Sequence, residues 1–259
     1  MNLSLLFSKF ILHRKSFLQL ITLKLFESYN KFFTKKTYRP EYEILIDYHL
    51  SKQENSDLEN ISIIEFGVAS GSSLKYLEDL KQKIEKKYNI EIKIYGFDTF
   101  EGMPKSQDIS DQIYDWKEGD YKADYEKVKS SLKYTKLIKG DIKDTINYEI
   151  FSKNEISNIL VIIFDLDYYS STSNAFKIFD NSLSKFLRPR VGVFFDNLHS
   201  STEISGEYLS IKQFNEKNIK NNQIISKDFY LEKYDNRFYQ YMNLNHKAFN
   251  INKKKKQIL

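Results

Sequence analysis

The fold of this 259-residue chain is decided by the stretch Ile61-Ser-Ile-Ile-Glu-Phe-Gly-Val-Ala-Ser-Gly71. Its first half is apolar and rich in isoleucine, which predicts a buried strand that ends at Glu65. Gly67 and Gly71 then predict a tight turn, because glycine permits backbone conformations and close approaches that a side chain would block. Ser72 opens a run with helical spacing. Such strand–turn–helix units are where doubly wound α/β sheets hold nucleotide-like ligands.

The rest of the chain repeats this alternation of strands and helices. Further strands are predicted over 92–97, 136–138, 159–164 and 191–195, and helices over 41–51, 74–88, 172–186 and 208–218. The segments that flank Asp235-Asn236, 228–234 and 237–242, predict an antiparallel β-hairpin. This order predicts a Rossmann-like α/β domain with a doubly wound, seven-stranded sheet, which is mostly parallel and ends in the antiparallel hairpin.

Each of the five predicted parallel strands ends at or just before an acidic residue. These residues are Glu65, Asp98, Asp141, Asp165 and Asp196. The carboxyl ends of parallel strands share one edge of the sheet, which is the ligand-binding edge of this architecture. Carboxylates gathered there repel one another unless positive or hydrogen-bonding groups lie among them. The pattern therefore predicts a functional site at that edge.

The same edge carries motifs that resemble the class I S-adenosylmethionine-dependent methyltransferases. Segment 65–71 is similar to the first motif of that family, Asp98 stands where the family binds the ribose hydroxyls, and Gly140-Asp141 stands at its adenine contact. The resemblance implies that S-adenosylmethionine is the cofactor. The residues implied to bind it are Glu65, Gly67, Ala69, Gly71, Ser72, Asp98, Thr99, Phe100 and Asp141.

Two longer runs carry a narrower resemblance: Gly-Phe-Asp-Thr-Phe-Glu-Gly-Met-Pro at 96–104 and Phe-Asp-Leu-Asp-Tyr-Tyr-Ser-Ser-Thr at 164–172. The first is similar to the Gly-Phe-Asp-Ser-Phe-Glu-Gly-Leu-Pro signature of the macrocin O-methyltransferase family, which methylates sugar hydroxyls, and the second is similar to that family's Asp-x-Asp-x-Tyr-x-Ser-Thr segment. The resemblance implies an O-methyltransferase that acts on a sugar, glycan or natural-product hydroxyl. A hydroxylase-like enzyme of the same superfamily and a non-catalytic cofactor-binding domain stay open as alternatives.

This second resemblance also implies a divalent metal, Mg²⁺, held by Asp165, Asp196 and Asn197. Oxygen ligands suit Mg²⁺, and a bound cation would lower the pKa of an acceptor hydroxyl. The macrocin-type enzymes have an acid where this chain has Asn197, so the charge of the ligand set is lower here. Asp165 is thereby implied in catalysis, and His199 and Asp167 are the candidates for the general base.

Composition narrows the cellular context. The chain has no cysteine, which excludes disulfides and thiolate sites and fits a cytoplasmic protein. Its net charge is only +5, and part of that comes from a basic tail over 251–259. No basic stripe of the kind that binds nucleic acid occurs in the interior of the sequence, so we expect no nucleic-acid partner.

The first 37 residues differ from the rest. They are apolar with scattered basic residues, and no uninterrupted apolar run approaches the roughly 18 residues that span a bilayer. We expect a helical extension over 1–37, a methyltransferase domain over 38–250, and a homo-oligomer. Three roles are open for the extension: packing on the domain, dimerisation, or peripheral contact with a membrane. The long polar segment 101–127 predicts a lid or a substrate wall.

Overall fold

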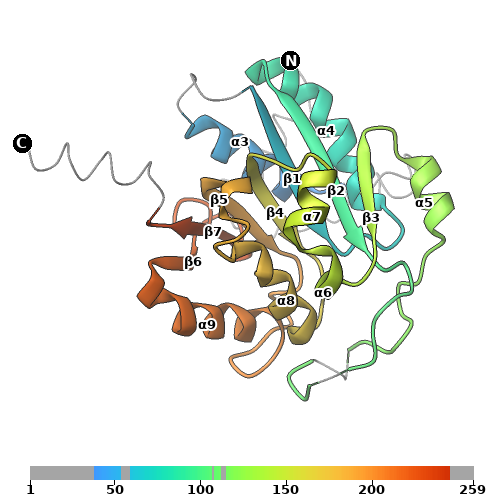
Figure 1. Ribbon diagram of the computed structural model, residues 1–259, viewed down its shortest axis with the longest axis vertical. Coiled ribbons are helices and arrows are strands. Elements are labelled where there is room, and N and C mark those ends of the chain that lie inside the picture. The colour runs from blue at the N-terminus through green and yellow to red at the C-terminus, as the bar shows by residue number, and fades with distance from the viewer. Residues whose placement is uncertain (1–37, 54–58, 107, 112–114, 246–259) are drawn as a thin grey trace, which may run out of the picture.

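A seven-stranded mixed sheet with the order β3-β2-β1-β4-β5-β7-β6 forms the centre of the protein (Figure 1). The computed structural model describes residues 38–53, 59–106, 108–111 and 115–245. The strands are β1 (Asn60–Phe66), β2 (Glu91–Asp98), β3 (Thr135–Lys139), β4 (Ile159–Phe164), β5 (Leu187–Phe195), β6 (Gln223–Lys227) and β7 (Phe238–Asn243). Strands β1 to β5 pair in parallel, and β7 pairs antiparallel with both β5 and β6. The predicted doubly wound fold is confirmed.

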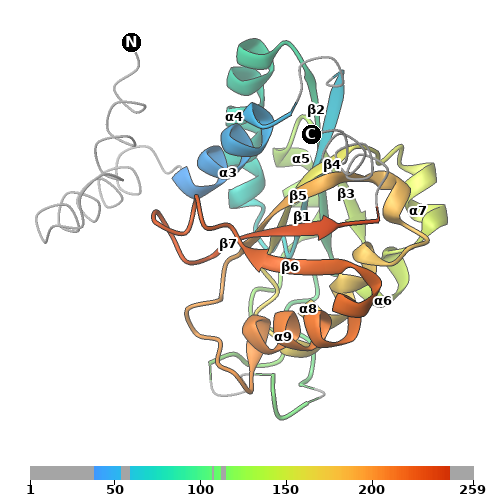
Figure 2. The ribbon, with the colours of Figure 1, turned by 90° about the vertical axis from the view of Figure 1, so that its left-hand side faces the viewer.

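Helices cover both faces of this sheet (Figure 2). They are α3 (Pro40–Ser51), α4 (Ser72–Tyr88), α5 (Tyr125–Ser131), α6 (Ile142–Thr145), α7 (Tyr148–Lys153), α8 (Tyr169–Ala175) and α9 (Gly206–Asn218). Alternate residues of β1 serve opposite faces: Ile63 packs in the core beneath α3 and α4, and Ile64 packs in the core beneath α6 to α9. Strands buried on both faces read as continuous apolar runs, which is why they could be predicted.

Helix α3 lies unusually close to the sheet. A Cβ atom at Gly192 of β5 would come within 2.5 Å of the His49 Cδ2 atom, so only glycine lets the helix and the strand approach in this way. The helix begins directly after Arg39, its N-cap residue. The close packing therefore brings Arg39 to the carboxyl end of β5.

Two predicted elements are wrong in detail. The predicted helix 172–186 ends at Ala175 and continues as the 3₁₀ segments Phe176–Phe179 and Ser184–Phe186, because the residues between these segments, Asp180-Asn-Ser, favour turns. The first strand of the hairpin is Gln223–Lys227 rather than 228–234. Asp228 ends this strand, since its Oδ1 atom accepts hydrogen bonds from the backbone N–H groups of Tyr230 and Leu231.

The predicted extension over 1–37 and the tail over 251–259 lie outside the described residues, and so do the expectations attached to them. Within the described residues, no helix has the length and apolar character needed to cross a bilayer.

Candidate active site

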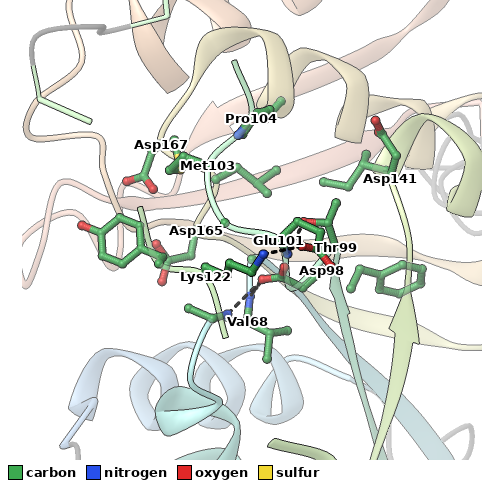
Figure 3. Close-up of a pocket in the computed structure, with 18 of the residues that line it drawn as sticks. Val68, Asp98, Thr99, Glu101, Met103, Pro104, Lys122, Asp141, Asp165 and Asp167 are labelled. Atoms are coloured by element: carbon green, nitrogen blue, oxygen red, sulfur yellow. Dashed lines mark hydrogen bonds and ion pairs between the residues drawn. The ribbon is translucent and has the colours of Figure 1, made fainter. Parts of the chain in front are cut away.

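A cavity of about 760 Å³ opens at the carboxyl edge of the parallel strands. Every turn that follows β1 to β5 contributes to its wall, as the strand-end acids predicted. The predicted site residues that line it are Gly67, Ala69, Ser72, Asp98, Thr99, Asp141, Asp165, Asp167, Asp196 and Asn197. Figure 3 shows Asp165 and Asp167 on one side of the cavity, and Asp98 and Asp141 on the other.

The remaining predicted residues are not part of the cavity wall. Glu65 is fully buried behind the turn, and the Tyr42 hydroxyl donates to its Oε1 atom at 3.3 Å. Gly71 is the N-cap of α4, and Phe100 packs its ring against Tyr125. His199 is exposed and does not line the cavity, so of the two candidate bases only Asp167 is part of the cavity wall.

The glycine turn is fixed from two sides. Gly67 has a φ of +86°, and a Cβ atom there would lie 1.8 Å from the carbonyl oxygen of Asp165, so the end of β4 passes directly against the turn. Asp98 holds the turn from the other side, because its Oδ2 atom accepts hydrogen bonds from the N–H groups of Val68 at 2.6 Å and Ala69 at 2.9 Å.

Asp98 therefore has a structural role that the sequence did not indicate. Its Oδ1 atom also accepts a hydrogen bond from the N–H group of Phe100 at 2.6 Å. A carboxylate offers about four acceptor sites, so three of them serve the backbone and one remains for a ligand in the cavity.

On the side of the cavity opposite Asp98, three carboxyl groups form the wall, and a fourth, the fully buried Glu207, is close enough to interact with them: the three are Asp165, Asp167 and Asp196. Burial raises the pKa of Asp165 well above its usual range, and the neighbouring charges of Asp196 and Asp167 raise it further. Burial also raises the pKa of Glu207, with contributions from Asp165 and Asp196. Glu207 lies in the first turn of α9, and its Oε2 atom accepts a hydrogen bond from the Asn197 N–H group at 3.1 Å.

Asp167 differs from the other members of this group. Its φ of +60° lies in the left-handed region, its side chain is only 7% exposed, and no residue in the described ranges donates a hydrogen bond to its carboxylate. Burial, followed by the charge of Asp196, raises the pKa of Asp167 to about 7. A strained backbone and an unpartnered carboxyl group in a cavity are features of functional sites.

Two arginines that sequence reasoning missed complete the cluster. The Nη1 atom of Arg39 lies 2.8 Å from the Oδ1 atom of Asp196, and the Nη1 atom of Arg237 lies 3.2 Å from the same oxygen. One signal was available for Arg237. It directly precedes the last strand of the predicted hairpin, and a strand antiparallel to β5 starts at the edge where β5 ends.

The expected Mg²⁺ ligands do not fit a divalent cation in this arrangement. Asp196 already binds two guanidinium groups through Oδ1, and Asn197 directs its amide N–H group, rather than its oxygen, toward Asp165 Oδ1 at 3.2 Å. Among the residues that the structure covers, no three His, Asp or Glu side chains are arranged to hold a metal ion.

The described residues 99–106, 108–111 and 115–124 form the outer wall of the cavity, and this part of the chain folds back on itself. The N–H group of Met103 donates to the carbonyl of Asp120 at 2.7 Å, and that of Gly119 donates to the carbonyl of Met103 at 2.9 Å. Asp111, which is fully buried, anchors this segment to the start of α8: its Oδ1 and Oδ2 atoms accept hydrogen bonds from the N–H and hydroxyl groups of Ser170 at 2.7 and 2.9 Å.

Comparison with solved structures identifies the fold. The crystal structure of CalS11, a calicheamicin methyltransferase, matches with a TM-score of 0.54 and 19% sequence identity, covering 93% of this chain and 90% of CalS11. An apo structure of CalS11, described as a TDP-rhamnose 3'-O-methyltransferase, matches with a TM-score of 0.47 and 18% identity over 93% and 92% of the two chains. No protein-family model and no curated protein sequence matches the chain.

The chain thus has the Rossmann-like fold of the class I S-adenosylmethionine-dependent methyltransferases, with the strand order β3-β2-β1-β4-β5-β7-β6 and an antiparallel β7. Its candidate site lies at the edge of the sheet where this architecture binds ligands.

Proposed function

We propose that this protein is an S-adenosylmethionine-dependent methyltransferase that methylates a hydroxyl group of a sugar-like acceptor. The observation that carries the proposal is the Asp167 carboxyl group, to which no described residue donates a hydrogen bond and which lines the same cavity as the glycine turn Gly67–Ser70. A methyl donor held at that turn and an acceptor hydroxyl beside Asp167 would share one enclosed space. The similarity to the fold of CalS11 supports this proposal, as do the runs 96–104 and 164–172 quoted above.

In this proposal the cofactor lies along the turns after β1, β2 and β3. Backbone groups of Gly67 and Ala69, at the turn that leads into helix α4, would face its amino-acid end. Thr99 and the last acceptor site of Asp98 would face its ribose, and Asp141 its adenine. When bound, the cofactor supplies an electrophilic methyl group on a sulfonium.

Asp167 would act on the acceptor. The acceptor hydroxyl would receive the methyl group, the cofactor would leave as its neutral thioether, and the Asp167 carboxylate would accept the proton that the hydroxyl loses. A base whose pKa lies near 7 suits proton transfer at neutral pH. Holding the two reactants in one orientation supplies much of the acceleration of such a displacement.

Two measurements test the proposal. Isothermal titration calorimetry with S-adenosylmethionine and with S-adenosylhomocysteine should show saturable binding of both. Incubation with methyl-labelled cofactor and a panel of free sugars, nucleotide sugars and glycosides should then transfer label to a hydroxyl. A protein that binds neither cofactor form does not have the proposed activity. Label found only on nitrogen or carbon would contradict the O-methyl assignment.

A further inference from the structure

The group that faces Asp196 is a pair of guanidinium ions. Both reach one oxygen of this carboxylate, at 2.8 Å from Arg39 and 3.2 Å from Arg237, and Arg237 also donates to the Asp196 backbone carbonyl at 3.4 Å. The Asp196 side chain is only 14% exposed, and the two arginines are its closest charged neighbours of opposite sign. A cation that used the Oδ1 atom of Asp196 as a ligand would have to compete with both arginines for that oxygen.

Each arginine is also held by contacts of its own. Arg237 binds both carboxylate oxygens of Asp235, with its Nη2 atom 2.7 Å from Oδ2, and its guanidinium lies 4.7 Å from the centre of the Phe194 ring. Arg39 lies 3.5 Å from Glu41 and 5.7 Å from the centre of the Tyr42 ring. Guanidinium groups that are already paired and stacked lose little further conformational freedom when they bind a carboxylate. The other contacts of Arg39 and Arg237 therefore orient both groups toward Asp196.

The charges of this arrangement match those that a metal would bring. A guanidinium is ionised at every physiological pH, so the pair carries the same charge as one divalent cation. A divalent cation placed between Asp165 and Asp196 would be repelled by both arginines at short range.

We propose that Arg39 and Arg237 replace the divalent cation at the carboxylate edge of this protein, and that the protein works without a metal. The catalytic role of the two arginines rests on the proposed methyltransferase function. Arg39 lines the cavity and would act as a positioning residue, which holds Asp196 and the neighbouring acids in place beside the acceptor.

Metal binding is tested directly with Mn²⁺, whose free ion has a strong electron paramagnetic resonance signal. Titration of the full chain with Mn²⁺ should leave the free-ion signal equal to that of buffer, and Asp196→Asn should behave identically. Uptake of one equivalent by the wild type that is lost in Asp196→Asn would overturn the proposal. This readout needs no cofactor, so it is independent of whether the methyltransferase function holds.

A double-mutant cycle, measured by melting temperature, tests whether the contact between Arg39 and Asp196 stabilises the folded protein. Arg39→Met should lower the melting temperature, and the same change in an Asp196→Asn background should lower it by less, because the partner is already neutral. Lys122→Met is the matched control, since Lys122 also lines the cavity but pairs with Glu101 at 2.9 Å. Equal losses from Arg39→Met in both backgrounds would contradict the proposal.

Cofactor titrations give the third readout. If S-adenosylmethionine binds, its affinity and the rate of turnover should be the same in excess EDTA as in excess Mg²⁺. A loss of turnover in EDTA that Mg²⁺ restores would contradict the proposal, and absent cofactor binding would contradict only the methyltransferase function.

Discussion

Asp167 differs from the neighbouring acids in its hydrogen bonds and in its backbone conformation. Two residues away, Asp165 is held by Asn197, and Asp196 is held by two arginines, whereas no described group donates to Asp167. It keeps a left-handed backbone conformation with φ of +60°, which costs a non-glycine residue about 1–2 kcal/mol. Such a cost, in a residue that lines a cavity, points to use in function rather than in stability.

We expect Asp167→Asn to separate binding from chemistry. The amide keeps the size of the side chain but cannot take the proton from the substrate hydroxyl, so kcat should fall by about 10²- to 10⁴-fold. The affinity for S-adenosylmethionine should be unchanged. Single-turnover rates and calorimetric titrations measure the two quantities. His199→Gln serves as the control. A larger loss in His199→Gln than in Asp167→Asn would transfer the role of base to His199.

Gly67 should tolerate no side chain. In Gly67→Ala the new methyl group would lie 1.8 Å from the carbonyl oxygen of Asp165, so β1 and β4 would have to separate, with an expected loss above about 4 kcal/mol in the free energy of unfolding. Gly119→Ala is matched in backbone conformation, with φ of +84°, and its Cβ meets no described atom within 4 Å. It should cost only about 1–2 kcal/mol. Similar losses in urea denaturation of the two variants would show that strain, not the clash, governs Gly67.

The strands and their acidic ends were accessible to sequence reasoning because both signals are local. A strand buried on both faces is an apolar run, and the residue that follows it is fixed at the same edge. The contacts that shape the site are not local: Arg39 meets Asp196 across 157 residues, and Asp111 meets Ser170 across 59. No periodicity reports such pairs, so the arginines and the anchor of the outer wall were missed.

The outer wall of the cavity depends on the contact between Asp111 and Ser170. Asp111 caps the start of α8 with both carboxylate oxygens, and its removal would leave the Ser170 N–H group unpaired. Asp111→Ala should therefore lower the free energy of unfolding by about 1–3 kcal/mol and speed hydrogen exchange over the wall.

Mass-spectrometric hydrogen exchange measures that loosening peptide by peptide. The matched control is Asp108→Ala, because the Asp108 side chain, among described donors, accepts a hydrogen bond only from the nearby N–H group of Ser110, at 2.8 Å. We expect the control to alter exchange at its own turn alone. Unchanged exchange over 99–124 in Asp111→Ala would mean that the wall is held by its internal hydrogen bonds.

The buried acids also set how the whole protein responds to pH. Burial raises the pKa of Glu65 from its usual 4.5 to about 7. Between these two pH values the Glu65 carboxyl group is ionised in the unfolded chain and protonated in the folded chain. Its contribution to the free energy of unfolding is therefore complete below pH 4.5, and it falls as the pH rises toward 7, by about 1.4 kcal/mol per pH unit. His49 opposes this trend, because burial lowers its pKa to about 3 and stability is lost as the pH falls below 6.5.

Comparing a Glu65 variant with the wild type cancels the contribution of His49, which both proteins share. Glu65→Gln cannot ionise, so its stability relative to the wild type should rise steadily from pH 4.5 to pH 7 and level off above. Urea denaturation at a series of pH values measures the difference. Glu101→Gln, at an exposed carboxyl group, should show no such rise. A constant difference between Glu65→Gln and the wild type would mean that Glu65 ionises normally in the folded protein.

The position of β7 has a consequence for biosynthesis. This strand is inserted between β5 and β6 although it follows both along the chain, and it brings Arg237 to the end of β5. A ribosome releases the amino-terminal strands first. A nascent chain that has formed β1 to β5 would therefore expose β5 as an open edge, with its acidic cluster short of one guanidinium. Only a polypeptide that includes β7 can close that edge and bring Arg237 to Asp196, so shorter translation products would lack the complete candidate site.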